Sequence, residues 1–419
     1  MRLGHDDLES LEFDIRGSMH EVGRKFLERL LSTRFTEGER EEIDEGYRFV
    51  GEREKTILTV LGEVRIMRRY YYDRERRNGF CPQDKALDVV GTRFSPGMRR
   101  IMGKVGAYQS FGLGEEDIEE LAGVHVTAKE VERIAENLGK EAEIFLQDSQ
   151  SRKEESKSNE AIKVGYIEMD GTGVPMVGNE TEGRQGKGAD GEAKTREAKL
   201  GSIFTQTSVD KNGYPIRDEL STTYTGAIET AEEFGKRINT EAVIRRIRGA
   251  DRVCVIGDGA TWIWNIAGEY FPGAVEMIDQ YHVREHYWNV ADLFFGKDKK
   301  RRQGWAEKRK MELDNGEVEK VIKSINRLNP STAEQKEACR REIGYFETNK
   351  RRMRYDRYRR EGLFVGSGVI EAGCRSIIAQ RLKQSGMHWS ARGANGIIAL
   401  RCCILSGLWE DFWEYRAAA

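Results

Sequence analysis

The spacing of hydrophobic and polar residues changes several times along the chain, and each change predicts a different element. Apolar side chains recur at helical spacing from Met19 to Leu31, and residues 1–50 are acidic and helical in pattern. Two runs rich in β-branched residues then flank Leu61-Gly62-Glu63, which predicts a β-hairpin over residues 55–67. Helical spacing returns over residues 98–147.

Residues 117–134 predict a helix-turn-helix. The first helix would end near Ala122, and Gly123 would supply the turn. Thr127 has Glu130 three residues later, which is the spacing of a capping box at the start of a second helix. Two helices joined in this way are a common DNA-binding arrangement.

A polar segment, residues 148–160, predicts a linker, and the pattern after it is that of an α/β domain. Short apolar strands alternate with helical segments there. The predicted strands are 164–169, 200–209, 253–256 and 275–278, and the predicted helices are 230–248, one that starts at Ala260, 370–382 and one or two within 391–415. Between them, residues 283–360 are helical in pattern and very polar.

The net charge of the chain hides a strong local imbalance. Its 419 residues include 69 Lys and Arg and 71 Asp and Glu, a net of −2, which by itself argues against nucleic-acid binding. Residues 283–360, however, hold 22 basic and 13 acidic residues, a net of +9. We therefore expect this region to be cationic enough to lie along a DNA duplex.

Nothing in the sequence suggests export or membrane insertion. The longest apolar runs fall short of the roughly 18 residues that a membrane span needs, and the acidic N-terminus has no apolar core of a signal peptide. The six cysteines show no C-x-x-C spacing, which favours a reduced, cytosolic protein. We expect a cytoplasmic protein with no membrane partner.

Three acidic residues stand where catalytic groups of α/β domains gather. Asp170 and Asp258 each end an apolar strand, and Glu371 lies in the first turn of a helix that Ser367 could cap. Three close carboxylates need a cation, and their oxygens suit Mg²⁺ or Mn²⁺, a pair of which can assist phosphoryl transfer. Taken singly, each acid also fits a turn or a helix start.

Other candidate motifs are weaker. Asp279 and His282 could be a pair supporting the acids or contacting DNA, or a helix N-cap with a packed histidine. A zinc site at His282 and His286 is not expected, because neither the H-E-x-x-H pattern nor a nearby cysteine is present. Cys374 is expected to be a buried structural thiol, and no complete nucleotide-binding glycine motif occurs.

Basic residues in several segments are candidates for DNA contact. Six arginines flank three consecutive tyrosines over 65–77, and residues 183–199 form a glycine-rich basic loop, although a solvated strand edge and a flexible hairpin explain these patterns too. The DNA-binding candidates are Arg65, Arg68, Arg69, Lys129, Arg133, Lys194, Arg196, Lys199, Arg351, Arg352, Arg375, Arg381 and Lys383.

Seven segments together resemble bacterial insertion-sequence transposases of the ISKra type, which are relatives of the eukaryotic Mutator-like elements. They are YIEMDGTGVPM (166–176), REAKLG (196–201), GDGATWIWN (257–265), FPGA (271–274), DQYH (279–282), GSGVIEAGC (366–374) and GMHWS (386–390), and the resemblance runs in order over residues 55–415.

The resemblance implies a ribonuclease H-like α/β core, a mixed sheet flanked by helices, with an all-α insertion and an N-terminal α+β region. It also implies that Asp170, Asp258 and Glu371 bind two Mg²⁺ or Mn²⁺ ions, and that His282 is catalytic because Mutator relatives carry a Cys-x-x-His pair there. Family members often have zinc-knuckle cysteines after the tyrosine run, but only Cys81 remains here, so zinc is not expected in that region.

We therefore expect a DNA transposase that binds terminal inverted repeats, nicks DNA and joins the freed 3′-hydroxyl to target DNA. It would act near the bacterial nucleoid as a homodimer or larger homo-oligomer, because two ends must be brought together. A ribonuclease H-like nuclease and a silent, domesticated DNA-binding regulator are the alternatives. The expected regions are 1–50 (helical), 51–97 (hairpin and basic segment), 98–147 (helix-turn-helix), 148–160 (linker), 161–282 with 361–419 (catalytic domain) and 283–360 (helical insertion).

Overall fold

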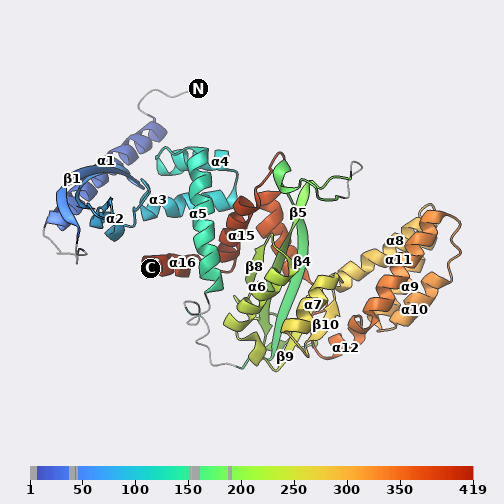
Figure 1. The fold of residues 1–419 in the computed structure, drawn as a ribbon. Coiled ribbons are helices and arrows are strands. Elements are labelled where there is room, and N and C mark those ends of the chain that lie inside the picture. Colours follow the sequence, from blue (N-terminus) through green and yellow to red (C-terminus); the bar gives the residue numbers. More distant parts are fainter. Residues whose placement is uncertain are drawn as a thin grey trace. The chain divides into compact units, whose positions relative to one another are not determined.

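The computed structural model describes residues 7–36, 43, 46–148, 150, 152, 161–186 and 191–418. It divides the chain into two compact units, Met1–Leu138 and Gly139–Ala419. Each unit contains one main β-sheet with helices packed on it, and the second also has a two-stranded ribbon (Figure 1). The predicted linker, 148–160, lies almost wholly outside the described residues.

The first unit is built on a three-stranded antiparallel sheet. Strands β1 (Arg48–Thr59) and β2 (Gly62–Asp73) form the predicted hairpin, which is longer than expected, and β3 (Asn78–Phe80) pairs with the end of β2. Gly62 has φ of 105°, a conformation that glycine adopts without steric cost. This explains why the chain reverses there.

Five helical segments follow or precede that sheet in the first unit. The long helix α1 packs Leu27 and Leu31 against a small core formed by Ile57, Val64 and their neighbours. The helices are α1 (Leu8–Thr36), α2 (Pro82–Ala86), α3 (Pro96–Tyr108), α4 (Phe111–Asp117), which continues as a π-helical turn (Ile118–Ala122), and α5 (Ala128–Gln147).

The predicted turn and capping box before α5 are confirmed. Gly123 follows the π-helical turn with φ of 66°. The Thr127 backbone N–H donates to Glu130 Oε2 at 3.1 Å, and the Glu130 backbone N–H donates to Thr127 Oγ1 at 3.3 Å. These reciprocal hydrogen bonds satisfy two backbone donors that an open helix start would leave unpaired.

The second unit contains a mixed five-stranded sheet in the order β10-β9-β4-β5-β8. Strands β4, β9 and β10 run parallel, whereas β5 is antiparallel to both of its neighbours, β4 and β8. The strands are β4 (Val164–Pro175), β5 (Thr195–Gln206), β8 (Thr223–Ala227), β9 (Arg252–Gly257) and β10 (Val275–Ile278), and a separate small ribbon joins β6 (Ser208–Val209) to β7 (Pro215–Ile216).

Helices flank this sheet and also form a separate helical group (Figure 1). The predicted insertion contains α8 to α12, of which α8 to α11 stand together beyond the β10 edge of the sheet. The helices are α6 (Ala231–Ile244), α7 (Thr261–Tyr270), α8 (Gln280–Phe295), α9 (Lys299–Asp314), α10 (Val318–Asn326), α11 (Ala333–Asn349), α12 (Tyr355–Arg360), α13 (Gly368–Gly373), which continues through a π-helical segment (Cys374–Ala379) into α14 (Gln380–Leu382), α15 (Ala391–Leu405) and α16 (Trp409–Ala418).

The core of the second unit holds both stacked aromatic rings and a buried ion pair. Tyr166 and Phe204 stack with ring centroids 4.8 Å apart across β4 and β5. Arg152 and Glu241 are both almost wholly buried, with Nη1 and Oε2 2.6 Å apart. Among the described residues, no helix is both long enough and apolar enough to cross a membrane.

Candidate active site

The β4–β9 pairing brings the two predicted aspartates level with each other. Val164 pairs with Arg252, and the same offset of 88 residues continues to Glu168 and Ile256, the last registered pair. Asp170 and Asp258 are separated by that offset, and neighbouring strands lie roughly 4.8 Å apart. The two carboxylates therefore meet where β9 ends.

Asp170 is a half-buried carboxyl with several close neighbours. Burial raises its pKa, and the charge of Asp258 raises it further. The Cys374 thiol donates a hydrogen bond to the carboxylate and lowers the pKa, as do the Gly171 backbone N–H at 2.7 Å and the charge of His282. We expected Cys374 to be a buried structural thiol. It is instead only partly buried, and its thiol contacts the Asp170 carboxylate.

Asp258 lies in a tight turn that is held from two sides. Its Oδ1 accepts a hydrogen bond from the Ala260 backbone N–H at 2.8 Å, and its carbonyl oxygen accepts one from Tyr345 Oη on α11 at 3.0 Å. Gly259 has φ of 109°, and a Cβ there would lie 2.8 Å from Tyr345 Cε2. Glycine is therefore required both by the backbone and by the tyrosine ring.

Glu371 reaches the same region from the first turn of α13. Burial raises its pKa first, and a hydrogen bond with the carboxyl of Asp279 and the charge of Asp170 raise it further. Two carboxyls that hydrogen-bond to each other must hold a proton between them. The predicted capping role of Ser367 is wrong, because its hydroxyl donates to Asp279 Oδ2 at 2.8 Å and makes no cap hydrogen bond.

Asp279 and His282 lie at the start of α8, beside these acids. Asp279 is buried and caps the helix by accepting a hydrogen bond from the Tyr281 backbone N–H at 2.9 Å, as one of our two interpretations expected. His282 is partly exposed, and its Nδ1 lies 3.7 Å from Glu285. His286 is engaged elsewhere, with Nδ1 2.5 Å from Glu342 Oε2 and its ring stacked 3.6 Å from that of Tyr345.

Glu168 is a site residue that the sequence analysis missed. It lies two residues before Asp170 on β4, is fully buried, and accepts hydrogen bonds from the Ile370 backbone N–H at 2.8 Å and from Ser202 Oγ at 3.4 Å. Burial raises its pKa to about 8, and the charge of Asp279 adds to this effect. The sequence did hold a signal for this residue, because Glu168 is an acid within the otherwise apolar predicted strand 164–169. Glu168 ties the start of α13 to the central strand.

A hard divalent cation fits the donor chemistry of the predicted ligands. Asp170, Asp258 and Glu371 offer only carboxylate oxygens, which Mg²⁺ and Mn²⁺ prefer. Across the described residues, no three His, Cys, Asp or Glu side chains converge as a metal-binding group. Hydrogen bonds from Cys374 to Asp170 and between Asp279 and Glu371 engage two of the three predicted ligands instead.

The predicted DNA-contacting residues fall into three groups. Arg68, Arg196 and Arg352 form ion pairs with Asp84, Glu180 and Glu276, respectively. Lys199 is 7% exposed, and Arg381 is wholly buried against the Trp389 ring, so these two pack inside the structure and do not present the surface for DNA that we expected. The exposed candidates are Arg65, Arg69, Lys129, Arg133, Lys194, Arg351, Arg375 and Lys383.

Lys383 is the exposed candidate that lies beside the acidic residues. Its Nζ donates to Thr172 Oγ1 at 2.5 Å, and Thr172 follows Asp170 by two residues on β4. Residues i and i+2 of a strand point to the same face. A positive charge is thus fixed close to the predicted catalytic carboxylates.

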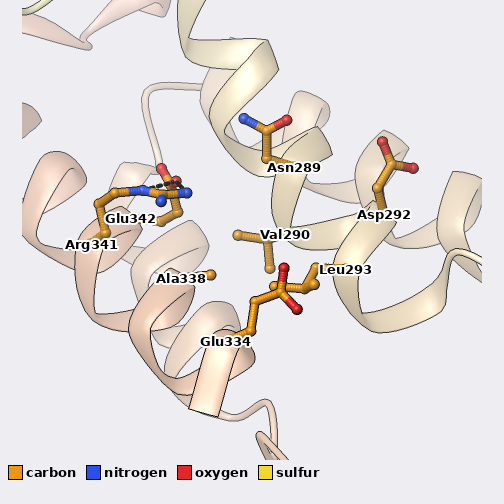
Figure 2. Close-up of a pocket in the computed structure, with 8 residues that line it drawn as sticks. All are labelled: Asn289, Val290, Asp292, Leu293, Glu334, Ala338, Arg341 and Glu342. Carbon is orange, nitrogen blue, oxygen red and sulfur yellow. Dashed lines mark hydrogen bonds and ion pairs between the residues drawn. The ribbon is translucent and has the colours of Figure 1, made fainter. Parts of the chain in front are cut away.

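The helical insertion contains a cavity of about 390 Å³ between α8 and α11 (Figure 2). Its lining is rich in acids, but two of them are neutralised: Glu342 pairs with Arg341 at 2.8 Å, and Asp292 pairs with Arg302 at 2.8 Å. Glu342 also holds His286, which stacks on Tyr345. The cavity wall is therefore connected by direct contacts to the turn that carries Asp258.

Comparison with known proteins finds a family model that covers almost the whole chain, and also finds similar solved structures. A family model described as "Uncharacterised protein family (UPF0236)" matches residues 6–414. The chain is 26% identical to a protein of Streptococcus gallolyticus described as "UPF0236 protein in vanSb 3'region", over 97% of this chain and 85% of that protein. A structure of the Drosophila P element transposase strand transfer complex matches 64% of this chain and 70% of that chain, with 11% identity and a TM-score of 0.22.

Proposed function

Because the chain belongs to the uncharacterised protein family UPF0236, we propose a function from its own residues: a DNA transposase that cleaves DNA and joins strands with divalent cations. The observation that carries the proposal is the shared register of Asp170 and Asp258, whose separation of 88 residues equals the β4–β9 offset. The strand pairing thus explains why two acids that lie far apart in the sequence are neighbours in the fold.

The topology of the sheet supports a ribonuclease H-like core. Three consecutive strands, β4, β5 and β8, form an antiparallel meander, and β9 and β10 then continue in parallel on the other side of β4. The first strand is thus central and carries Asp170, the fourth carries Asp258 at its end, and a later helix carries Glu371. A mixed sheet flanked by helices, with these three acids, is consistent with what the resemblance to ISKra-type transposases implies.

The proposed chemistry assigns a separate task to each group. Asp170, Asp258 and Glu371 would hold two Mg²⁺ or Mn²⁺ ions, which when bound stabilise charge on the phosphate and activate the attacking oxygen. The carboxylates serve as ligands and not as nucleophiles, so no covalent protein–DNA intermediate forms. Lys383, held beside β4 by Thr172, would attract the DNA backbone.

DNA recognition is proposed for the first unit. The helix α4 with its π-helical turn, the Gly123 turn and α5 together support a helix-turn-helix. Lys129 and Arg133 are exposed, lie four residues apart near the start of α5 and therefore share one helix face. Arg65 and Arg69 on β2 would add phosphate contacts.

The decisive experiment uses DNA that carries the inverted repeats flanking the coding region. Purified protein is incubated with this DNA and MgCl₂, and nicked and strand-joined products are separated on denaturing gels. Asp170→Asn, Asp258→Asn and Glu371→Gln should each abolish cleavage while DNA binding persists, whereas Asp251→Asn, an exposed aspartate at the start of β9, should remain active. Cleavage that persists in any of the three variants refutes the assignment.

The same experiment separates the alternatives. Magnesium-dependent cleavage without joined products would indicate a nuclease on this fold. Binding of the repeats with no cleavage in Mg²⁺ or Mn²⁺ would indicate a DNA-binding regulator. Lys129→Ala and Arg133→Ala should each lower the affinity for DNA and make that affinity less dependent on salt concentration. This result would support the recognition role of α5.

A further inference from the structure

Helix α1 presents an apolar stripe to solvent along almost its whole length. Its seven residues are each between 46% and 70% exposed. They are spaced by three or four positions, which keeps them on one face of a helix. The stripe consists of Leu8, Leu11, Ile15, Met19, Val22, Phe26 and Leu30.

The opposite face of α1 already has its partners, so the stripe is not the face that holds the helix to its unit. Leu27 and Leu31 pack on the hairpin core. Arg24 Nη1 donates to the Glu63 carbonyl at 3.3 Å, and Glu28 Oε1 accepts from the Arg65 backbone N–H at 2.9 Å. A helix that is fixed on one face and strongly apolar on the other presents an interaction surface, because contiguous apolar patches rarely face water without a function.

The charges along α1 indicate what covers the stripe. Its N-terminal half carries the exposed acids Glu9, Glu12 and Asp14. Its C-terminal half carries the exposed bases Lys25 and Arg29 and one exposed acid, Glu21, whose Oε1 lies 3.0 Å from Lys25 Nζ. Asp14 and Lys25 are eleven residues apart, about three turns, and therefore lie along the same edge of the stripe. A second α1 in the opposite direction would place acids beside bases, whereas a parallel copy would bring the two acidic halves together.

We propose that α1 pairs with α1 of a second copy of this chain, antiparallel and about a two-fold axis near Met19. The middle of the stripe lies at Met19, so Ile15 of one helix packs near Val22 of the other. In an antiparallel pair the same edges of two helices meet, which brings Asp14 beside Lys25 of the second copy. The surface is self-complementary, as a two-fold interface requires, and it does not depend on the proposed reaction.

The first test measures the mass of the full chain by light scattering and sedimentation at micromolar concentration. The wild type should be a dimer, and Ile15→Glu/Val22→Glu should weaken self-association by about a hundredfold or more, because charges then meet in the centre of the interface. Both side chains are exposed, so the variant chain should keep its fold, as its circular dichroism spectrum would check. The matched control is Ile144→Glu, at 63% exposure on α5, which should leave the dimer intact.

The second test fixes the orientation. Asp14→Lys should weaken the dimer, because a lysine would face Lys25 of the second copy, and the double variant Asp14→Lys/Lys25→Asp should restore it. A monomeric wild type overturns the proposal, as does a dimer that Ile15→Glu/Val22→Glu leaves intact. Charge-swapped pairs that fail to recover overturn the antiparallel arrangement, and binding of the wild-type stripe to phosphatidylcholine vesicles in place of self-association overturns the assignment to a second copy.

Discussion

Replacing Glu168 by glutamine should change how the stability of the second unit depends on pH. Burial raises the pKa of this carboxyl to about 8, compared with 4.5 for an ordinary glutamate. Between these values the folded chain binds more protons at this position than the unfolded chain does. The stability that Glu168 contributes is thus complete below about pH 4.5, falls as pH rises, and is lost above about pH 8.

The expected effect is large enough to measure. A difference of about 3.5 pH units corresponds to about 5 kcal/mol, at about 1.4 kcal/mol for each unit. Glutamine cannot ionise, and its amide oxygen can still accept the hydrogen bonds from Ile370 N–H and Ser202 Oγ. Wild type should therefore lose about 3 kcal/mol relative to Glu168→Gln between pH 5.5 and 8.

The assay is urea unfolding, monitored by tryptophan fluorescence in EDTA at a series of pH values. Subtraction of the wild-type and Glu168→Gln free energies removes the contribution of every other titrating group. Glu219→Gln, at an exposed position, is the matched control and should run parallel to the wild type. A wild-type minus Glu168→Gln difference that stays constant from pH 5.5 to 8 would refute the reasoning.

Three further predictions concern the packing around the sites. Arg152→Met leaves the buried carboxylate of Glu241 without its 2.6 Å partner and should lower the free energy of unfolding by about 3–5 kcal/mol in urea titrations, a loss that Arg152→Met/Glu241→Leu should largely recover. Thr127→Ala removes half of the capping box and should cost about 1 kcal/mol, seen as faster amide exchange in the first turn of α5. Gly259→Ala combines a φ of 109° with a Cβ 2.8 Å from Tyr345 and should cost about 1–3 kcal/mol in the same titrations; unchanged stability would contradict the described turn.

The strands and the first two acids of the site were predictable because their signals are local. An apolar run precedes Asp-Gly in both β4 and β9, and the spacing of Asp170 and Asp258 already equals the strand offset. The prediction that Asp170 ends its strand is wrong, however, because β4 continues through Asp170 to Pro175 and only β9 ends before its aspartate. The short strand β8, by contrast, contains Gly226 and two threonines that face buried surroundings. Its five residues lack the clear periodicity that identified the other strands.

Contacts that join distant segments were not predictable from pattern. Tyr345 reaches Asp258 from 87 positions away, and no feature of the sequence near Tyr345 indicates that partner. The exposure of a basic residue is equally hard to infer, since Arg381 looks like its neighbour Lys383 but is buried against Trp389. Ser367 occupies the position of a helix cap, yet a buried carboxylate competes successfully for its hydroxyl.

The hydrogen bond from Tyr345 to the Asp258 carbonyl has a consequence for how this protein could be shortened. Residues 283–360 were predicted as an insertion, but α11 within them supplies the Tyr345 contact, and α8, which starts just before them at Gln280, is capped by Asp279. A variant made by excising that segment would lose the support of the turn that contains Asp258. The smallest stable form of the second unit is therefore expected to include these helices, whose outer surface could vary far more readily than their length.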